Sequence, residues 1–221
     1  MNRLELARYI DHTQLNPFAT EKDIEKLVEE AKKYKFYSVV VNPYYVKLAK
    51  ELTKGTDIKV VSVVGFPFGT TYKEVKAYET ELVIKDGADE IDMVMNISAA
   101  KSGRWDVVKE DIKAVNDVVK RYGKVLKVIL ETGYLTDEEK IKACEVAVEA
   151  GADFVKTSTG FGKGGATVHD VELMYKTVKG RAQVKAAGGI HDANTALAMI
   201  KAGATRIGAS HSVDIIESLK E

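Results

Sequence analysis

The tripeptide Ala150-Gly151-Ala152 stands between a segment of helical periodicity and the short apolar run Phe154–Ser158. The tripeptides Asp86-Gly87-Ala88 and Ala202-Gly203-Ala204 occupy the same kind of place elsewhere in the chain. Glycine directly after a helix often adopts a left-handed conformation, which ends the helix and turns the chain. The recurring tripeptide therefore indicates that a unit of helix, turn and strand repeats along the sequence.

Short β-branched runs alternate with longer helical segments throughout the chain, and we expect strands at Tyr9–Thr13, Ser38–Asn42, Lys59–Gly65, Glu90–Asn96, Val125–Thr132, Phe154–Ser158, Gln183–Ala187 and Arg206–Ala209. Eight strands that each precede a helix within 221 residues fit a closed (β/α)8 TIM barrel of the α/β class. We predict that residues 1–221 form this barrel as a single domain. A doubly wound sheet is the rival, but it usually has a glycine-rich turn after its first strand, and Thr13-Gln14-Leu15-Asn16-Pro17 contains no glycine.

Helical spacing of apolar residues and capping-box patterns support the helices expected between the strands. Val108, Ile112, Val115 and Val119 recur at helical spacing and predict one buried face. Two segments match the capping-box pattern, Thr71-x-x-Glu74 and Thr136-x-x-Glu139, and each predicts the beginning of a helix.

The composition narrows the possible functions. Hydrophobic residues make up 45% of the chain, which is enough for a sizeable core. Thirty-three basic residues balance 33 acidic ones, which argues against a nucleic-acid or membrane-surface partner because phosphate contacts need a basic excess. A single cysteine, Cys144, forbids an internal disulfide, and no apolar signal region opens the sequence, so a cytoplasmic protein is expected.

Charged residues stand at strand positions that should face the barrel axis. Alternate residues of a barrel strand face the helices and are apolar there, as Ile91, Met93 and Met95 are, so Asp92 must face inward. The same alternation turns five further ionisable side chains inward: Asp11, Lys127, Glu131, Lys156 and Lys185. Burying a charge away from water costs free energy, so a cluster of inward charges indicates a specific structural or catalytic role.

Two interpretations of this cluster differ in what the charges do. Lys127 and Glu131 are equally compatible with a structural ion-pair network and with a functional role. For Asp92, Lys156 and Lys185 together we favour a catalytic role, because clusters of perturbed ionisable groups gather at active sites. A neighbouring cation lowers the pKa of a lysine, and an unprotonated lysine is a nucleophile toward carbonyl groups. Lys156 and Lys185 as neighbours would therefore suit Schiff-base chemistry on a carbonyl group.

Three glycine-rich segments follow the last three strands: Gly160–Gly165, Gly188-Gly189 and Gly208–Ser212. Barrel enzymes often bind a phosphate group with the loops at this place, so a phosphorylated substrate is expected. The four histidines show no metal-ligand spacing and are expected to be surface or capping residues. We therefore predict no metal and no cofactor.

Several of these segments together resemble the family of deoxyribose-phosphate aldolases. The matching segments are Asp11-His12-Thr13, Glu90–Val94, Leu126–Thr132, Lys156-Thr157-Ser158-Thr159-Gly160-Phe161 and Val184–Ile190. The resemblance extends from about Tyr9 to His211, nearly the whole chain.

The resemblance implies a metal-independent class I aldolase that reversibly cleaves 2-deoxy-D-ribose 5-phosphate to acetaldehyde and D-glyceraldehyde 3-phosphate. It implies that Lys156 forms the Schiff base, that Asp92 transfers protons and that Lys185 tunes Lys156. The substrate and its phosphate are expected at Asp11, Thr157, Gly162, Gly188, Gly189, Gly208 and Ser210. A homodimer or larger homo-oligomer is expected as well.

Three alternatives remain open on the residues alone: another Schiff-base barrel enzyme, such as a transaldolase-like or keto-acid aldolase, a phosphosugar isomerase, and a non-catalytic sugar-phosphate sensor. Lys163 and His211 stand where relatives often have other residues. Each could add positive charge near the phosphate or could point into solvent.

Overall fold

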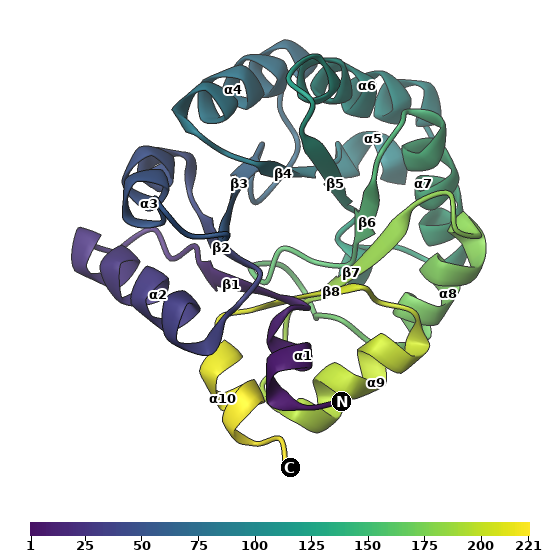
Figure 1. Cartoon of the computed structure of the whole chain (residues 1–221). Coiled ribbons are helices and arrows are strands. Elements are labelled where there is room, and N and C mark those ends of the chain that lie inside the picture. The colour runs from purple at the N-terminus through teal and green to yellow at the C-terminus, as the bar shows by residue number, and fades with distance from the viewer.

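The computed structural model describes all 221 residues and contains one closed barrel of parallel strands in sequential order (Figure 1). The strands are β1 (Ile10–Gln14), β2 (Ser38–Val41), β3 (Lys59–Val64), β4 (Glu90–Val94), β5 (Val125–Ile129), β6 (Phe154–Lys156), β7 (Gln183–Ala187) and β8 (Arg206–Ala209). The barrel closes where β8 pairs with β1. The predicted TIM barrel is confirmed, and the doubly wound sheet is wrong.

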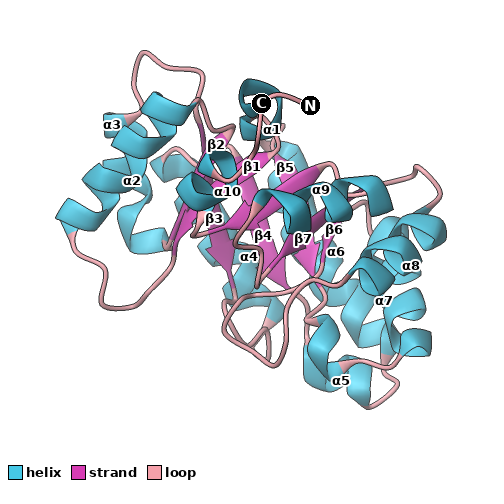
Figure 2. Cartoon of the chain, turned by 90° about the horizontal axis from the view of Figure 1, so that it is seen from below, coloured by secondary structure: helices cyan, strands magenta, loops and turns pink.

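One major helix follows each strand and packs on the outside of the barrel (Figures 1 and 2). These helices are α2 (Glu21–Tyr34), α3 (Val46–Leu52), α4 (Lys73–Asp86), α6 (Trp105–Arg121), α7 (Asp137–Glu149), α8 (Val168–Val178), α9 (Ala193–Ala202) and α10 (Ser212–Glu217). Four short elements are added: α1 (Arg3–Ala7), α5 (Ile97–Lys101), and the 3-10 helices η1 (Pro43–Tyr45) and η2 (Thr132–Tyr134). None of the helices has the length and apolar character needed to cross a membrane.

Three strands end two or three residues earlier than the sequence suggests. We expected β4, β5 and β6 to reach Asn96, Thr132 and Ser158, but they end at Val94, Ile129 and Lys156. The residues beyond each strand form loops at the carboxyl end of the barrel. Glu131 shows the change most clearly, because its φ of 59° is left-handed and cannot continue a strand.

Helix ends follow local chemistry in most places. Gly203 ends α9 with φ of 126°, and a Cβ atom there would come within 2.4 Å of the Tyr175 ring, so only glycine fits. Thr136 and Glu139 form the expected capping box of α7. The box expected at Thr71 does not form, because α4 begins one residue later than the box requires, with Tyr72 as its cap.

The apolar core lies mainly between the barrel and its helices, in one cluster of 54 buried residues. A second, small cluster lies inside the barrel and consists of Leu15, Val40, Val61 and Val63. These valines come from β2 and β3, while β1 and β4 to β8 each place at least one charged side chain inside the barrel. The barrel interior is therefore divided into an apolar side and a charged side, and the charged side contains the candidate site.

Candidate active site

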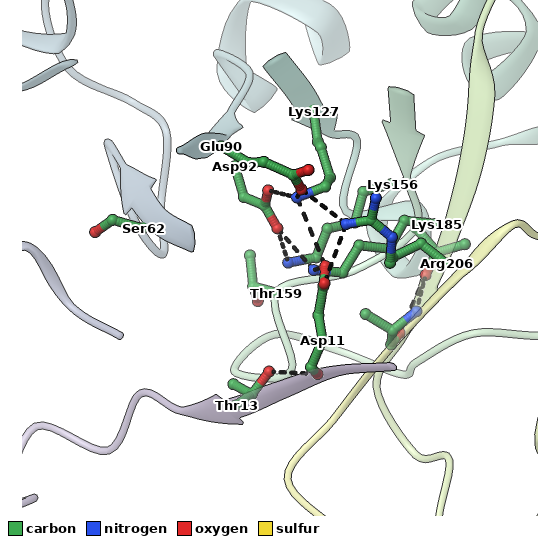
Figure 3. Close-up of polar contacts among 12 residues, drawn as sticks. Asp11, Thr13, Ser62, Glu90, Asp92, Lys127, Lys156, Thr159, Lys185 and Arg206 are labelled. Atoms are coloured by element: carbon green, nitrogen blue, oxygen red, sulfur yellow. Dashed lines mark hydrogen bonds and ion pairs between the residues drawn. The ribbon is translucent and has the colours of Figure 1, made fainter. Parts of the chain in front are cut away.

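Asp92 lies at the centre of the charged side and accepts hydrogen bonds from three lysines (Figure 3). Its Oδ2 atom accepts from Lys156 Nζ at 3.0 Å and from Lys185 Nζ at 2.9 Å, and its Oδ1 atom accepts from Lys127 Nζ at 2.8 Å. All four residues are buried. The predicted convergence of these side chains on the barrel axis is confirmed.

The register of the strands brings these residues together. Asp92 on β4 is level with Lys127 on β5, and Lys156 on β6 is level with Lys185 on β7. The inward side chains of neighbouring strands therefore meet in pairs, and long lysine side chains reach across to a carboxylate near the axis. Gly208 on β8 leaves room for this, because a Cβ atom there would come within 2.8 Å of Lys185 Cε.

A second set of contacts completes the network below the reacting groups. Asp11 accepts from Lys185 at 2.7 Å and from Arg206 at 3.1 Å. Glu90 pairs with Arg206 and with Lys127, each at 2.7 Å. The sequence reasoning missed Glu90 and Arg206, although each stands two positions before an inward residue and shares its face of the strand.

The prediction that Glu131 belongs to this cluster is wrong. Because β5 ends at Ile129, the alternation of faces no longer applies at Glu131. Its buried carboxylate instead accepts hydrogen bonds from the backbone N–H and the hydroxyl of Thr159, in the loop after β6. Glu131 thus fixes a loop beside the site, whereas Lys127 is part of the ion network.

The charges of the network balance only when one lysine is neutral. Three carboxylates face four cationic groups: Asp11, Glu90 and Asp92 against Lys127, Lys156, Lys185 and Arg206. Burial and the Lys185 cation lower the pKa of Lys156 to about 8, although Asp92 opposes the shift. Lys156 is therefore the member of the cluster that most readily provides a neutral amine.

Asp92 and Lys127 stay charged near neutral pH. Burial alone would raise the pKa of Asp92, but the cations of Lys127, Lys185 and Lys156 outweigh burial and hold it well below the usual range. Burial alone would lower the pKa of Lys127, but the carboxylates of Asp92, Asp11 and Glu90 raise it above its usual value. Asp92 is thus a fixed negative charge that Lys156 and Lys185 share.

Lys156 opens into a cavity of about 250 Å³ at the carboxyl end of the barrel. The predicted residues Gly188, Gly189, Gly208 and Ser210 line this cavity, together with Thr13, Leu15, Thr159 and Phe161. Lys156 and a glycine-lined surface therefore border the same cavity, so one molecule could contact both.

Three predicted substrate residues do not line that cavity. Asp11 lies beneath it in the ion network. The Thr157 hydroxyl contacts the backbone of Ala187 and joins β6 to β7. Gly162 lines a neighbouring cavity, where a Cβ atom would come within 2.7 Å of the Glu131 carboxylate. A carboxylate so close makes the surroundings of Gly162 unfavourable for a phosphate group.

Lys163 and His211 are both exposed and also lie outside the cavity lining. The carbonyl of Lys163 lies against Gly133, on the side of the neighbouring cavity. The His211 ring lies 4.3 Å from that of His191, which does line the cavity, and its Nδ1 atom is 3.3 Å from Asp214.

Asp137, His169 and Asp170 have ligand atoms close enough together to hold a metal ion, but they lie on α7 and α8 and Lys140 already donates to both carboxylates.

Among the histidines, the expectation of surface or capping residues is wrong for His12, which is buried between β1, α2 and α10.

Comparisons with known proteins agree with this geometry. Residues 6–214 match the model of the DeoC/LacD family of aldolases. The deoxyribose-phosphate aldolase of Aciduliprofundum boonei is 61% identical over 220 residues, covering 100% of this chain and 99% of that protein, and that of Thermococcus gammatolerans is 59% identical over 98% and 97%. A deoxyribose phosphate aldolase from Aeropyrum pernix, described as having a unique tetrameric structure, superposes with a TM-score of 0.93 at 36% identity, covering 98% of this chain and 92% of that one. The chain belongs to the DeoC/LacD family of aldolases.

Proposed function

We propose that this protein is a class I aldolase that reversibly cleaves 2-deoxy-D-ribose 5-phosphate to acetaldehyde and D-glyceraldehyde 3-phosphate through a Schiff base on Lys156. The observation that carries the proposal is the environment of Lys156, which opens into the cavity and whose pKa is lowered to about 8. The identity to named deoxyribose-phosphate aldolases, 56–61% along nearly the full chain, supports the choice of substrate.

The first step forms the covalent link. The neutral amine of Lys156 attacks the aldehyde carbon of the open-chain sugar, and uptake of one proton from solvent with loss of one water gives a protonated imine. That imine restores the positive charge that the free amine lacked, beside the carboxylate of Asp92, which lies 3.0 Å from Lys156 Nζ. The carboxylate therefore stabilises the charge that develops during the step.

The second step breaks the carbon chain. Asp92 takes the proton of the C3 hydroxyl through a bridging water, the C2–C3 bond breaks, and its electron pair moves into the imine to give an enamine. The cations of Lys127 and Lys185 hold Asp92 ionised, so its carboxylate is available as the acceptor. Protonation of the enamine at C2 and addition of water then release acetaldehyde and the free lysine.

The glycine-lined end of the cavity is proposed to hold the phosphate group. Gly188, Gly189 and Gly208 present backbone close to the ligand, and Ser210 adds a hydroxyl at the same end. We propose Asp11 and Thr157 as supporting residues rather than phosphate contacts, since one holds Lys185 and the other joins two strands.

Reductive trapping tests this function directly. Acetaldehyde and borohydride should attach one ethyl group to the wild-type chain at Lys156, as located by peptide mass spectrometry. Lys156→Ala should lose both this label and the cleavage of 2-deoxyribose 5-phosphate. Lys163→Ala removes an exposed lysine from the loop that follows β6, and this variant should be labelled like the wild type. Labelling of Lys156→Ala at the normal stoichiometry would place the nucleophile elsewhere. An isomerase or a sugar-phosphate sensor would not be labelled at all.

Two further expectations remain part of the proposal. The protein is proposed to assemble with further copies of itself, which the described tetramer of the Aeropyrum pernix protein supports. Its proposed location is the cytoplasm. The mass of the native particle in solution, measured by light scattering, tests the first of these.

A further inference from the structure

His12 is a buried histidine that the proposed chemistry does not use. It lies on β1 between two residues of the site region, Asp11 and Thr13, but its side chain points away from the barrel axis. Only 2% of the residue is exposed, and its ring lies 4.8 Å from that of Phe36. A polar ring placed this deeply needs partners for both of its nitrogen atoms.

Both nitrogens of His12 have a partner on a different helix. Nδ1 lies 2.8 Å from the hydroxyl of Ser212, the first residue of α10, and Nε2 lies 3.2 Å from the carboxylate of Glu30 on α2. The Ser212 hydroxyl also lies 2.9 Å from the carbonyl oxygen of Ala209, the last residue of β8. The contacts form one chain from Glu30 through His12 and Ser212 to Ala209.

Both ends of this chain are acceptors. The Ala209 carbonyl and the Glu30 carboxylate can only accept, so the Ser212 hydroxyl donates to Ala209 and Nε2 of His12 donates to Glu30. The contact between Nδ1 of His12 and the Ser212 oxygen joins these two hydrogen bonds. The hydrogen bond from His12 in turn lowers the pKa of Glu30, which keeps that carboxylate ionised.

The far end of this chain is part of the site. Gly208, Ala209 and Ser210 line the cavity, and the turn from Ala209 to Ser212 carries the Ser210 hydroxyl. The Ser212 hydroxyl holds this turn closed by binding Ala209, and His12 holds the hydroxyl in the orientation that does so. The contacts also cross the seam at which β8 closes on β1.

We infer that His12, held between Glu30 and Ser212, is a positioning residue that holds the Ala209–Ser212 turn in the shape that receives the phosphate group of the substrate. The inference rests on the proposed function for the identity of that group. It assigns His12 no contact with the substrate, so its effect should appear in the binding of phosphate and not in the carbon–carbon cleavage.

Two amide substitutions separate the two contacts of the ring. Asparagine places its amide about where Nδ1 lies and can still donate to Ser212, whereas glutamine reaches about as far as Nε2 and can contact only Glu30. We expect His12→Gln and Ser212→Ala to raise KM for 2-deoxyribose 5-phosphate by about fivefold, the value of one hydrogen bond, with kcat within twofold. His12→Asn should stay close to the wild type, and unphosphorylated deoxyribose should be cleaved equally by all variants.

Tyr34→Phe is a matched control for general loosening. The Tyr34 hydroxyl also joins α2 to α10, but it binds Glu217 at 2.7 Å, at the far end of α10 from the turn. Its removal deletes one hydrogen bond between the same two helices, so thermal stability should fall while KM stays unchanged. If Tyr34→Phe raised KM as much as His12→Gln, or if His12→Asn were as impaired as His12→Gln, the positioning role would be wrong.

One measurement judges the inference without turnover. The dissociation constant of inorganic phosphate, measured by calorimetry, should rise about fivefold in His12→Gln and stay close to the wild-type value in His12→Asn. Unchanged phosphate binding in His12→Gln would overturn the inference. Failure of reductive trapping would instead refute the proposed function and leave the phosphate result to decide on His12.

Discussion

Replacing Lys185 with leucine removes one buried cation while keeping much of the side chain's bulk. Lys156 and Lys185 both donate to Asp92 Oδ2, at 3.0 and 2.9 Å, so their nitrogens lie within about 6 Å of each other. Two unit charges at that separation repel by about 1.4 to 2.8 kcal/mol for an effective dielectric constant of roughly 40 to 20. Since about 1.4 kcal/mol corresponds to one pKa unit, the pKa of Lys156 should rise by about one to two units from its value of about 8.

A higher pKa leaves less neutral amine at neutral pH. The rate of reductive trapping with acetaldehyde at pH 7 should therefore fall by roughly ten- to a hundredfold in Lys185→Leu. The loss should shrink as the pH rises, because the amine then loses its proton again. Trapping rates measured across the neutral and alkaline range should show the acid limb of the profile displaced toward alkaline pH.

Lys185→Arg is the matched control, because it keeps a cation at the same position and should leave the acid limb nearly where it is. Circular dichroism must show that each variant is folded, since Asp11 and Asp92 each lose a buried partner in Lys185→Leu. An equal loss of rate at every pH would refute tuning of Lys156. Proton transfer or substrate positioning by Lys185 would then be the better explanation.

Three further outcomes follow from the same structure. The pKa values of Asp11 and Asp92 are held below the usual range, so the stability that these carboxylates contribute is present above about pH 4 and should be lost as the pH falls further. The urea concentration at the midpoint of unfolding should therefore drop with acidification in the wild type, and it should drop less in Asp92→Asn. Cleavage of 2-deoxyribose 5-phosphate should be unchanged after EDTA, and a loss that Zn²⁺ restores would contradict a lysine-based mechanism. Lys163→Ala should leave KM for that substrate within about twofold, because Lys163 lies outside the cavity lining, and His211→Ala should raise it less than Ser210→Ala does.

The inward charges that sequence reasoning found share one property. Asp92, Lys127 and Lys185 each lie between two apolar strand residues that are buried against the helices, and Lys156 follows the buried Val155, so the alternation of faces turns all four side chains inward. The same rule reached Asp11 from the burial of Ile10. Local pattern is sufficient in these strands because their outer face has to be apolar.

The alternation of faces failed as a guide where a residue does not lie inside a strand between buried neighbours. Glu90 and Arg206 are the first residues of their strands, and the sequence does not tell whether such an end is covered; here the Tyr37 and Phe154 rings lie against Arg206. Glu131 lies beyond the end of its strand, where a left-handed residue breaks the alternation. Those positions depend on contacts between distant segments.

His12 illustrates the same limit. Its partners, Glu30 and Ser212, lie 18 and 200 residues away in the sequence. No local sequence pattern predicts that His12, Glu30 and Ser212 come together, so the reason for burying a histidine on β1 is visible only in the closed barrel.

The division of the barrel interior has a consequence for how this scaffold can change its substrate. The apolar side, with Val40 and Val61, makes no hydrogen bond or ion pair with the lysines, and Leu15 of the same cluster lines the catalytic cavity. Substitutions at Leu15 can therefore change the size and shape of the cavity without altering the charge balance that makes Lys156 nucleophilic. Acceptance of new aldehydes and retention of the lysine chemistry are separable traits in this barrel, because they reside on opposite sides of one interior.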